Sequence, residues 1–233
     1  MHLFYTPEIE TKQELPPVEA AHCSRVLRLQ VGDEIALTDG KGAFYDASIT
    51  ASSAKCVLFQ IIATHKQAPL WNGYIHLAMA PTKNMDRNEW LAEKATEVGF
   101  DRLTFLKCRF SERKVIKNER ISKILVSAMK QSQKARLPQL DELTEFKEFV
   151  QQDFSGQKFI AHCYKGQERS EFKNLIDPKQ DCLLLVGPEG DFSEEEVALA
   201  LECGFQPVVL GPSRLRTETA ALVGVVLMNT SHY

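Results

Sequence analysis

The sequence predicts an α/β protein in two parts, a small N-terminal β-barrel and a larger, mostly parallel sheet with helices on both faces. In residues 1–70, β-branched and aromatic stretches are separated by turn residues. In residues 71–233, short apolar stretches alternate with helical patterns. Such alternation favours parallel strands joined by crossover helices. We therefore expect two domains, residues 1–70 and residues 71–233.

The N-terminal part contains short elements only. One amphipathic helix is expected at residues 18–29, before the stop signal Gly32-Asp33. The expected strands are residues 34–39, 43–50 and 55–65. Several short strands and one helix in so short a stretch suggest a barrel. Residues 65–73, which contain Pro69 and Asn72-Gly73, are the expected linker.

The C-terminal part has the longer periodic segments. Strands are expected at residues 74–80, 102–108, 158–163, 182–186 and 207–210. Helices are expected at residues 84–98, 118–134 and 193–203, and from about residue 217 onward. This order predicts a doubly covered parallel sheet.

Composition narrows the class of protein. The chain has 233 residues, 44% of them hydrophobic and 25% charged, as in ordinary globular proteins. It has no apolar run long enough for a membrane span and no secretory signal, so we expect a cytoplasmic protein without a membrane partner. The six cysteines are scattered and form no C-x-x-C pair, which predicts reduced thiols and no metal site.

The charge is unevenly distributed along the chain. Residues 107–136 contain 10 Lys/Arg against 2 Asp/Glu, whereas residues 137–233 contain 8 against 16. A basic stretch of this kind can bind the phosphates of a nucleic acid, although a solvated helix face is an equally good interpretation.

The first loop that could carry chemistry is residues 187–193, directly after an apolar strand. Glycines at the end of a buried strand allow a ligand to approach the backbone. Ser193 and Glu196 have the spacing of a capping box that starts the next helix. The acidic residues around the loop, Glu189 and Asp191 among them, would repel phosphate and favour a positively charged ligand. A plain connection to a capped helix is the alternative interpretation.

The second loop is residues 210–220, which join a strand to the last helix. If Thr217 is the N-cap of a buried apolar helix, the threonines of the loop are explained. Arg214 and Arg216 then have no structural purpose, which favours a functional one.

In both loops the sequence resembles the RsmE family of 16S rRNA uridine-N3 methyltransferases, in the SPOUT superfamily. The closest motifs are Gly187-Pro188-Glu189-Gly190-Asp191 and Leu215-Arg216-Thr217-Glu218-Thr219-Ala220. Further similar segments are His22-Cys23-Ser24-Arg25-Val26-Leu27-Arg28, Glu93-Lys94-Ala95-Thr96-Glu97-Val98-Gly99, Ser111-Glu112-Arg113, and Gln131-Ser132 with Pro138. Three positions depart from the family pattern: Asp191 replaces a glycine, Lys134 an arginine and Lys130 a glutamate.

The resemblance implies a PUA-like N-terminal β-barrel followed by a SPOUT α/β domain with a deep C-terminal trefoil knot. It also implies a homodimer that acts on 16S rRNA or the small ribosomal subunit, with S-adenosyl-L-methionine as cofactor and no metal. The cofactor-binding residues it implies are Leu185, Val186, Gly187, Pro188, Glu189, Gly190, Leu210, Gly211, Leu215, Arg216, Thr217, Thr219 and Ala220.

Arg216 and Glu218 are the candidate catalytic residues. Methylation at N3 of uracil removes the imide proton, and the arginine could stabilise the resulting charge on O2 and O4. Glu218 could accept the proton or hold Arg216 in place, and we favour the second role. His22 and His162 lie near the motifs, and for each we favour a structural role over a catalytic one.

RNA contacts are expected from basic and polar residues outside the cofactor loops. The candidates are His22, Arg25, Arg28, Lys83, Arg113, Lys114, Gln131, Lys134 and Arg136. A non-catalytic RNA-binding protein is an alternative, but it leaves the two glycine loops unexplained. A 2′-O-ribose methyltransferase of the same superfamily would show an Asn-rich first motif, which residues 84–99 do not resemble. A dinucleotide oxidoreductase needs G-x-G-x-x-G, and the loop at residue 187 lacks that spacing.

Overall fold

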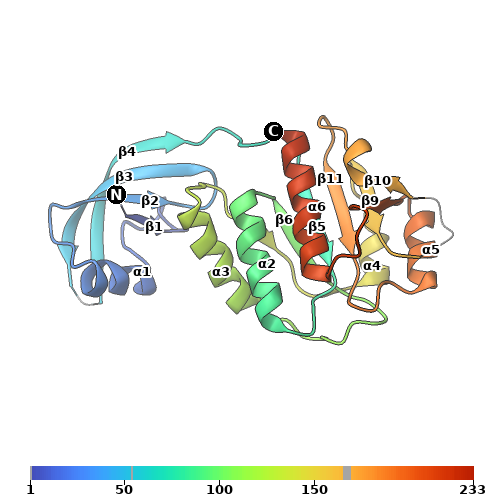
Figure 1. The fold of residues 1–233 in the computed structure, drawn as a ribbon. Helices are drawn as coiled ribbons and strands as arrows, with labels where there is room; N and C mark the ends of the chain where they lie inside the picture. Colours follow the sequence, from blue (N-terminus) through green and yellow to red (C-terminus); the bar gives the residue numbers. More distant parts are fainter. Residues whose placement is uncertain (1, 54, 165–168) are drawn as a thin grey trace. The chain divides into compact units, whose positions relative to one another are not determined.

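A computed structural model describes residues 2–53, 55–164 and 169–233 of the chain (Figure 1). The chain divides into two compact units. The first unit consists of Met1–Pro69 together with Val126–Leu137, and the second of Leu70–Leu125 together with Pro138–Tyr233. A short segment from the middle of the sequence thus packs with the N-terminal residues. The independence of residues 1–70 and 71–233 as domains stays a prediction.

The first unit contains a four-stranded sheet in the order β1-β2-β3-β4. Its strands are β1 (Leu3–Tyr5), β2 (Glu34–Thr38), β3 (Ala43–Ser52) and β4 (Val57–Lys66). β1 pairs in parallel with β2, and the other two pairings are antiparallel. The chain after β1 pairs with the opposite edge of the sheet, since the Leu15 N–H donates to the Val57 carbonyl at 2.9 Å.

The expected helix at residues 18–29 is shorter and less regular in the structure. An α-helix, α1 (Pro17–Ala21), continues as a π-helical turn, η1 (His22–Val26). The expectation that it reaches residue 29 was wrong, because Arg28 adopts a left-handed backbone with φ of 56°. A residue in that conformation cannot continue a right-handed helix.

The segment from the middle of the sequence is tied to the β-sheet of the first unit. Helix α3 (Asn118–Gln131) ends three residues before the expected position, and Gln133 then has a φ of 54°. Ala135 is fully buried, and its carbonyl accepts a hydrogen bond from the Gly42 N–H at 2.9 Å. An ion pair of 2.5 Å joins Lys130 to Glu19.

The second unit is built on a parallel sheet with the strand order β10-β12-β9-β11-β5-β6-β7, and β8 pairs with β6. This confirms the mixed α/β class expected from the alternating pattern. The strands are β5 (Ile75–Met79), β6 (Arg102–Lys107), β7 (Gln139–Leu140), β8 (Thr144–Glu145), β9 (Gln157–Ala161), β10 (Ser170–Glu171), β11 (Cys182–Val186) and β12 (Gln206–Val209).

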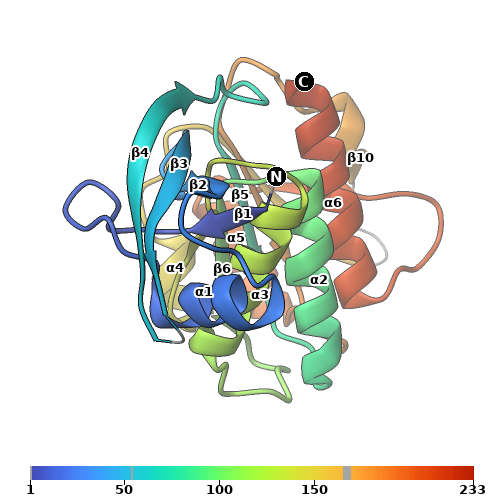
Figure 2. The same cartoon turned by 90° about the vertical axis from the view of Figure 1, so that its left-hand side faces the viewer.

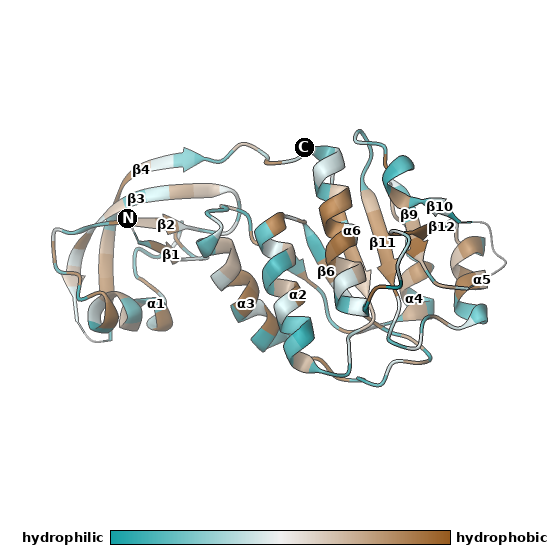
Figure 3. Ribbon diagram, in the orientation of Figure 1, coloured by the Kyte–Doolittle hydropathy of each residue, from teal (hydrophilic) through white to brown (hydrophobic). Residues whose placement is uncertain are grey.

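Helices cover both faces of this sheet. Figures 1 and 2 show α2 (Met85–Val98) and α6 (Thr217–His232) side by side on one face, with α4 (Phe146–Val150) and α5 (Glu194–Glu202) on the other. Helix α6 and strand β11 are predominantly hydrophobic (Figure 3). A Cβ atom at Gly224 would lie 2.2 Å from Leu184 Cδ2, so this glycine allows α6 to pack closely on β11.

Several short elements were not expected from the sequence. They are β1, β7, β8, β10, helix α4 and the 3-10 turn η2 (Phe172–Asn174). Each is too short to show a recognisable hydrophobic period. All six cysteines are free. Among the described residues, no helix has both the length and the apolar character needed to cross a membrane.

Candidate active site

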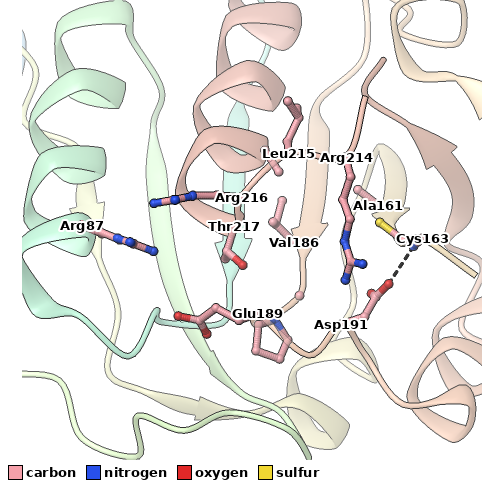
Figure 4. Close-up of a pocket in the computed structure, with 13 residues that line it drawn as sticks. Arg87, Ala161, Cys163, Val186, Glu189, Asp191, Arg214, Leu215, Arg216 and Thr217 are labelled. Atoms are coloured by element: carbon pink, nitrogen blue, oxygen red, sulfur yellow. Dashed lines mark hydrogen bonds between the residues drawn. The ribbon is translucent and has the colours of Figure 1, made fainter. Parts of the chain in front are cut away.

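A cavity of about 390 Å³ opens where β9 and β11 end and α6 begins (Figure 4). Its volume is within the range of small-molecule pockets, about 300–1,000 Å³. The carboxyl ends of parallel strands are the usual ligand-binding edge of an open α/β sheet. The residues around it are Arg87, Ala161, Cys163, Val186, Gly187, Pro188, Glu189, Asp191, Arg214, Leu215, Arg216, Thr217 and Ala220.

The first loop, residues 187–193, is fixed at its far end by the predicted capping box. The Ser193 hydroxyl accepts a hydrogen bond from the Glu196 N–H at 3.2 Å, and the Glu196 carboxylate accepts one from the Ser193 N–H at 2.8 Å. This confirms the expected start of α5. Phe192 is fully buried and packs on the ring of Phe146 at a centroid distance of 5.3 Å.

The conformation and hydrogen bonds of Asp191 explain how aspartate can replace the family glycine at this position. Its φ is 68°, a left-handed conformation that glycine adopts without strain and aspartate tolerates better than most residues. The carboxylate uses this position to tie two loops together. Oδ2 accepts the Cys163 N–H at 2.7 Å, and Oδ1 accepts the Phe192 N–H at 2.8 Å. The substitution therefore adds a link between the ends of β9 and β11.

The two glycines of the loop have protein neighbours. A Cβ atom at Gly187 would lie 3.1 Å from the ring of Phe192, and one at Gly190 would lie 3.2 Å from Cβ of Phe110. Phe110 is itself 47% exposed. Close packing within the protein is therefore one reason for glycine at both positions, besides the expected approach of a cofactor.

The second loop leads directly into α6. The N-cap is Arg216, with φ of −70° and ψ of 155°, and it makes no side-chain capping bond. The interpretation of Thr217 as N-cap was therefore wrong by one residue, because Thr217 already has helical geometry. Thr217 and Glu218 are buried, whereas the Arg216 side chain is exposed and extends into the cavity region (Figure 4).

Arg87 is a cavity residue that the sequence analysis missed. It lies in the first turn of α2, and its Nε is 3.6 Å from Oε1 of Glu218. Among the described residues, the ion pair of Glu218 is thus with Arg87 and not with Arg216. The other carboxylate oxygen of Glu218 is buried and has no hydrogen-bond partner there. Nothing in the spacing of a polar helix end indicates that it will face the first turn of a helix near the C-terminus.

Three predicted RNA contacts lie on loops beside Glu189. The Glu189 carboxylate accepts the Lys83 N–H at 2.9 Å, and the Arg113 guanidinium donates to the carbonyl of Thr82 at 3.1 Å and to that of Lys83. The Lys83 ammonium pairs with Glu112 at 2.7 Å, which raises the pKa of Lys83. Lys83 and Arg113 therefore stabilise the loop next to the cavity, while Lys114 is exposed.

The remaining RNA candidates belong to the first unit. Those that are exposed are His22, Arg25, Arg28, Gln131 and Arg136. Lys134 is only 8% exposed, and its expected contact with RNA phosphate stays a prediction.

Most of the predicted cofactor residues surround two adjoining cavities. The first cavity includes Val186, Gly187, Pro188, Glu189, Leu215, Arg216, Thr217 and Ala220, and the second adds Leu210 and Gly211. Leu185, Gly190 and Thr219 line neither of them. Charged side chains of both signs and glycine-containing loops at the ends of parallel strands define a site for a small, charged ligand.

Comparison with known proteins identifies the class. Residues 69–229 match the family described as RNA methyltransferase domain, and residues 19–62 match the RNA methyltransferase PUA domain. The chain belongs to this RNA methyltransferase family, and the resemblance seen in its motifs is confirmed.

Individual relatives agree with this result. A probable rRNA-methyltransferase of Porphyromonas gingivalis has a similar structure, with 41% identity, a TM-score of 0.95, and coverage of 100% of this chain and 98% of that one. A ribosomal RNA small subunit methyltransferase E of Neisseria gonorrhoeae, solved bound to S-adenosyl methionine, has 27% identity, a TM-score of 0.86, and coverage of 99% and 97%. The Synechocystis protein named ribosomal RNA small subunit methyltransferase E is 29% identical, over 97% of this chain and 76% of its own length.

Proposed function

We propose that this protein transfers the methyl group of S-adenosyl-L-methionine to N3 of a uridine in 16S ribosomal RNA. The observation that carries the proposal is the cavity at the ends of β9 and β11. The two loops that form it contain the segments that resemble the RsmE family, Gly187–Asp191 and Leu215–Ala220. Two of the relatives named above are ribosomal RNA small subunit methyltransferases by their names, and one of these two is solved with this cofactor.

The cavity residues suit a ligand with charges of both signs. S-adenosyl-L-methionine supplies a methyl group on a positively charged sulfur, and it also carries an ammonium and a carboxylate. Glu189 and Asp191 offer negative charge to the cationic groups, and Arg214 offers positive charge to the carboxylate. Val186, Leu215 and Ala220 provide apolar walls. These residues, with the rest of the predicted cofactor set, would hold the cofactor.

The protein must also manage the N3 proton of the uracil, which is a weakly acidic imide. Arg216 and Arg87 both line the cavity, so two guanidinium groups can stabilise negative charge on the O2 and O4 atoms of the base. Glu218 holds Arg87 through their ion pair. Its second oxygen is buried and has no hydrogen-bond partner in the described part of the chain, so this oxygen is the candidate proton acceptor.

The finer features of the fold belong to the same proposal. We infer that the N-terminal sheet is part of a PUA-like barrel, which is supported by the pairing of residues 14 and 15 with β4. We also infer a deep trefoil knot in the SPOUT domain. Helix α6 packs on β5 and β11, whereas the strand before it, β12, lies beyond β9. Residues 210–216 therefore cross the ends of two strands, and this crossing supports the knot that the family resemblance implies.

The partners follow from this function. We propose that the exposed basic residues of the first unit bind 16S rRNA or the small subunit in the cytoplasm. We also propose a homodimer, because Trp90 on α2 and Val226 on α6 are exposed apolar residues on neighbouring helices. Sedimentation analysis tests the dimer, and a purely monomeric protein would contradict it.

Two measurements test the function itself. Calorimetry with S-adenosyl-L-methionine should show binding, which a non-catalytic RNA-binding protein would lack. Mass-spectrometric mapping of rRNA from a deletion strain should show the loss of one base-methylated uridine. Loss of a 2′-O-methyl group instead would favour a ribose methyltransferase and contradict the proposal.

A further inference from the structure

A second cavity of about 400 Å³ adjoins the first one. The two share several residues, among them Val186 at the end of β11 and Leu215 in the loop before α6. The second cavity differs in its further walls, which include the aliphatic side chains of Val208, Val209 and Leu210. The combined site therefore has one half that contains the carboxylates Glu189 and Asp191, and a second half with the larger aliphatic wall, called here the apolar half. Arg214 lines both halves, and Arg169 lines the second one.

His162 lies at the wall of the apolar half. It is 4% exposed, and its Nε2 atom has no hydrogen-bond partner among the described residues. Its Nδ1 atom accepts the backbone N–H of Tyr164 at 3.3 Å. A neutral imidazole whose Nδ1 accepts a hydrogen bond carries its proton on Nε2. The unpartnered atom is therefore a donor.

The surroundings keep this imidazole neutral. Burial lowers the pKa of His162, and the positive charge of Arg169 lowers it further, while Asp191 acts in the opposite direction. The Arg169 guanidinium donates to the His162 carbonyl, so that cation lies close by. A buried neutral donor without a partner costs free energy unless a ligand or a water satisfies it.

The chemistry of the two halves matches the two halves of the cofactor. Adenine has flat apolar faces and neutral ring nitrogens that accept hydrogen bonds at its edge. The methionine part carries the ammonium, the carboxylate and the sulfonium, which suit the half that contains Glu189, Asp191 and Arg214.

We propose that the Nε2–H of His162 donates a hydrogen bond to a ring nitrogen of adenine, and so selects the cavity in which the adenosine half of S-adenosyl-L-methionine binds. The inference rests on the proposed function, because it takes this cofactor as the ligand. It replaces the structural role that the sequence suggested for His162. In this role His162 is a specificity residue and takes no part in methyl transfer.

The first test uses calorimetry on matched variants. His162→Phe should weaken S-adenosyl-L-methionine binding about tenfold, the size of one hydrogen bond. His162→Gln, which keeps an N–H donor, should recover most of that loss. His76→Phe removes another buried histidine, at the opposite end of the sheet's strands, and should leave the affinity unchanged. Circular dichroism checks that each variant is folded.

The second test needs only the unmodified protein. With histidine labelled by ¹⁵N, adenosine should shift the Nε2–H resonance of His162, and free methionine should not. One of 1-deaza-, 3-deaza- or 7-deazaadenosine should bind about tenfold more weakly than adenosine, and the position of the missing nitrogen identifies the acceptor.

The outcomes distinguish a failure of the role of His162 from a failure of the proposed function. If the unmodified protein binds the cofactor while folded His162→Phe binds it equally well, or if all three deaza analogues match adenosine, the role of His162 is overturned and the proposed function stands. If the unmodified protein binds no S-adenosyl-L-methionine, the proposed function is overturned with it.

Discussion

The Nε atom of Arg87 lies 3.6 Å from Oε1 of Glu218 and joins the first turn of α2 to the first turn of α6. The Glu218 side chain is 9% exposed and that of Arg87 38%, so the carboxylate is the buried partner. Arg87 lines the cavity together with Arg216. A buried carboxylate paired with a cavity arginine suggests that Glu218 fixes the position of the Arg87 guanidinium.

This relationship gives the first prediction. Arg87→Ala should lower the methylation rate about a hundredfold, the scale for losing one donor to a developing anion. Glu218→Gln should cost about tenfold, and the double variant should be no slower than Arg87→Ala, because residues acting as a unit are not additive. Rates and cofactor affinities are measured separately, and the affinities should stay within a few-fold.

The control is the ion pair between Arg120 and Glu89, since Glu89 lies on the same helix α2. Arg120→Ala should leave the rate unchanged. If Glu218→Gln instead costs more than Arg87→Ala and removes the pH dependence of the rate, Glu218 is the proton acceptor.

Arg216 carries the second prediction. It is exposed at the N-cap of α6 and makes no capping bond, so its removal should not destabilise the helix. Arg216→Ala should keep the cofactor affinity within a few-fold and lower the rate by about two orders of magnitude. Arg216→Lys keeps the charge but loses the planar pair of donors. Its rate should therefore lie between the rates of the unmodified protein and of Arg216→Ala. A normal rate in the alanine variant contradicts the assignment.

The third prediction concerns Gly190, where the structure adds a second reason for glycine besides the expected approach of the cofactor. A side chain there meets Phe110 at 3.2 Å, so the effect of Gly190→Val on cofactor binding has two sources. We expect Gly190→Val to abolish measurable cofactor binding in a folded protein. Adding Phe110→Ala, which removes the protein contact, separates the sources. Recovery of binding in the double variant would show that glycine serves the packing of Phe110, and no recovery that it serves the cofactor.

Features that depend on residues close together in the sequence were predictable, and features that depend on contacts between distant segments were not. β11 was predicted at its observed bounds, residues 182–186, because a fully buried strand is a continuous apolar run. The capping box at Ser193 and Glu196 was predicted because its partners are three residues apart. The packing of residues 126–137 with the first unit, and the meeting of Arg87 with Glu218, depend on contacts between distant segments that leave no local pattern.

Asp191 allows a prediction from its departure from the family pattern. Asp191→Gly removes the strain of φ at 68°, which is worth about 1 kcal/mol. It also removes the hydrogen bonds that two backbone N–H groups donate to the carboxylate. Hydrogen bonds to charged groups contribute about 1.5–3 kcal/mol each, so the loss outweighs the gain. Denaturant titration should show lower stability in Asp191→Gly, with Asp191→Asn in between. Equal or higher stability of the glycine variant would contradict the tie between the loops.

The last prediction concerns the dependence of stability on pH. His76 is 4% exposed on β5, and its Nε2 lies 2.8 Å from the Thr104 hydroxyl. Burial lowers the pKa of His76 from 6.5 to about 3, with Arg102 lowering it and Asp141 raising it. The unfolded chain therefore binds a proton below pH 6.5 that the folded protein does not bind. Protonation of the unfolded chain lowers the free energy of unfolding. The full stability is therefore present above pH 6.5 and is lost as the pH falls toward 3.

Over the interval from pH 6.5 to pH 5 the loss should be about 2 kcal/mol, at about 1.4 kcal/mol for each unit of pH. Urea titrations at pH 7.5 and pH 5 measure it. His76→Gln removes the titrating group, so its stability should change less between the two pH values than that of the unmodified protein. His65→Gln is the matched control, because His65 is an exposed histidine paired with Asp46 at 2.8 Å in the first unit. That variant should keep the acid destabilisation attributed to His76. An equal loss of stability in His76→Gln and the unmodified protein would show that another group controls the response.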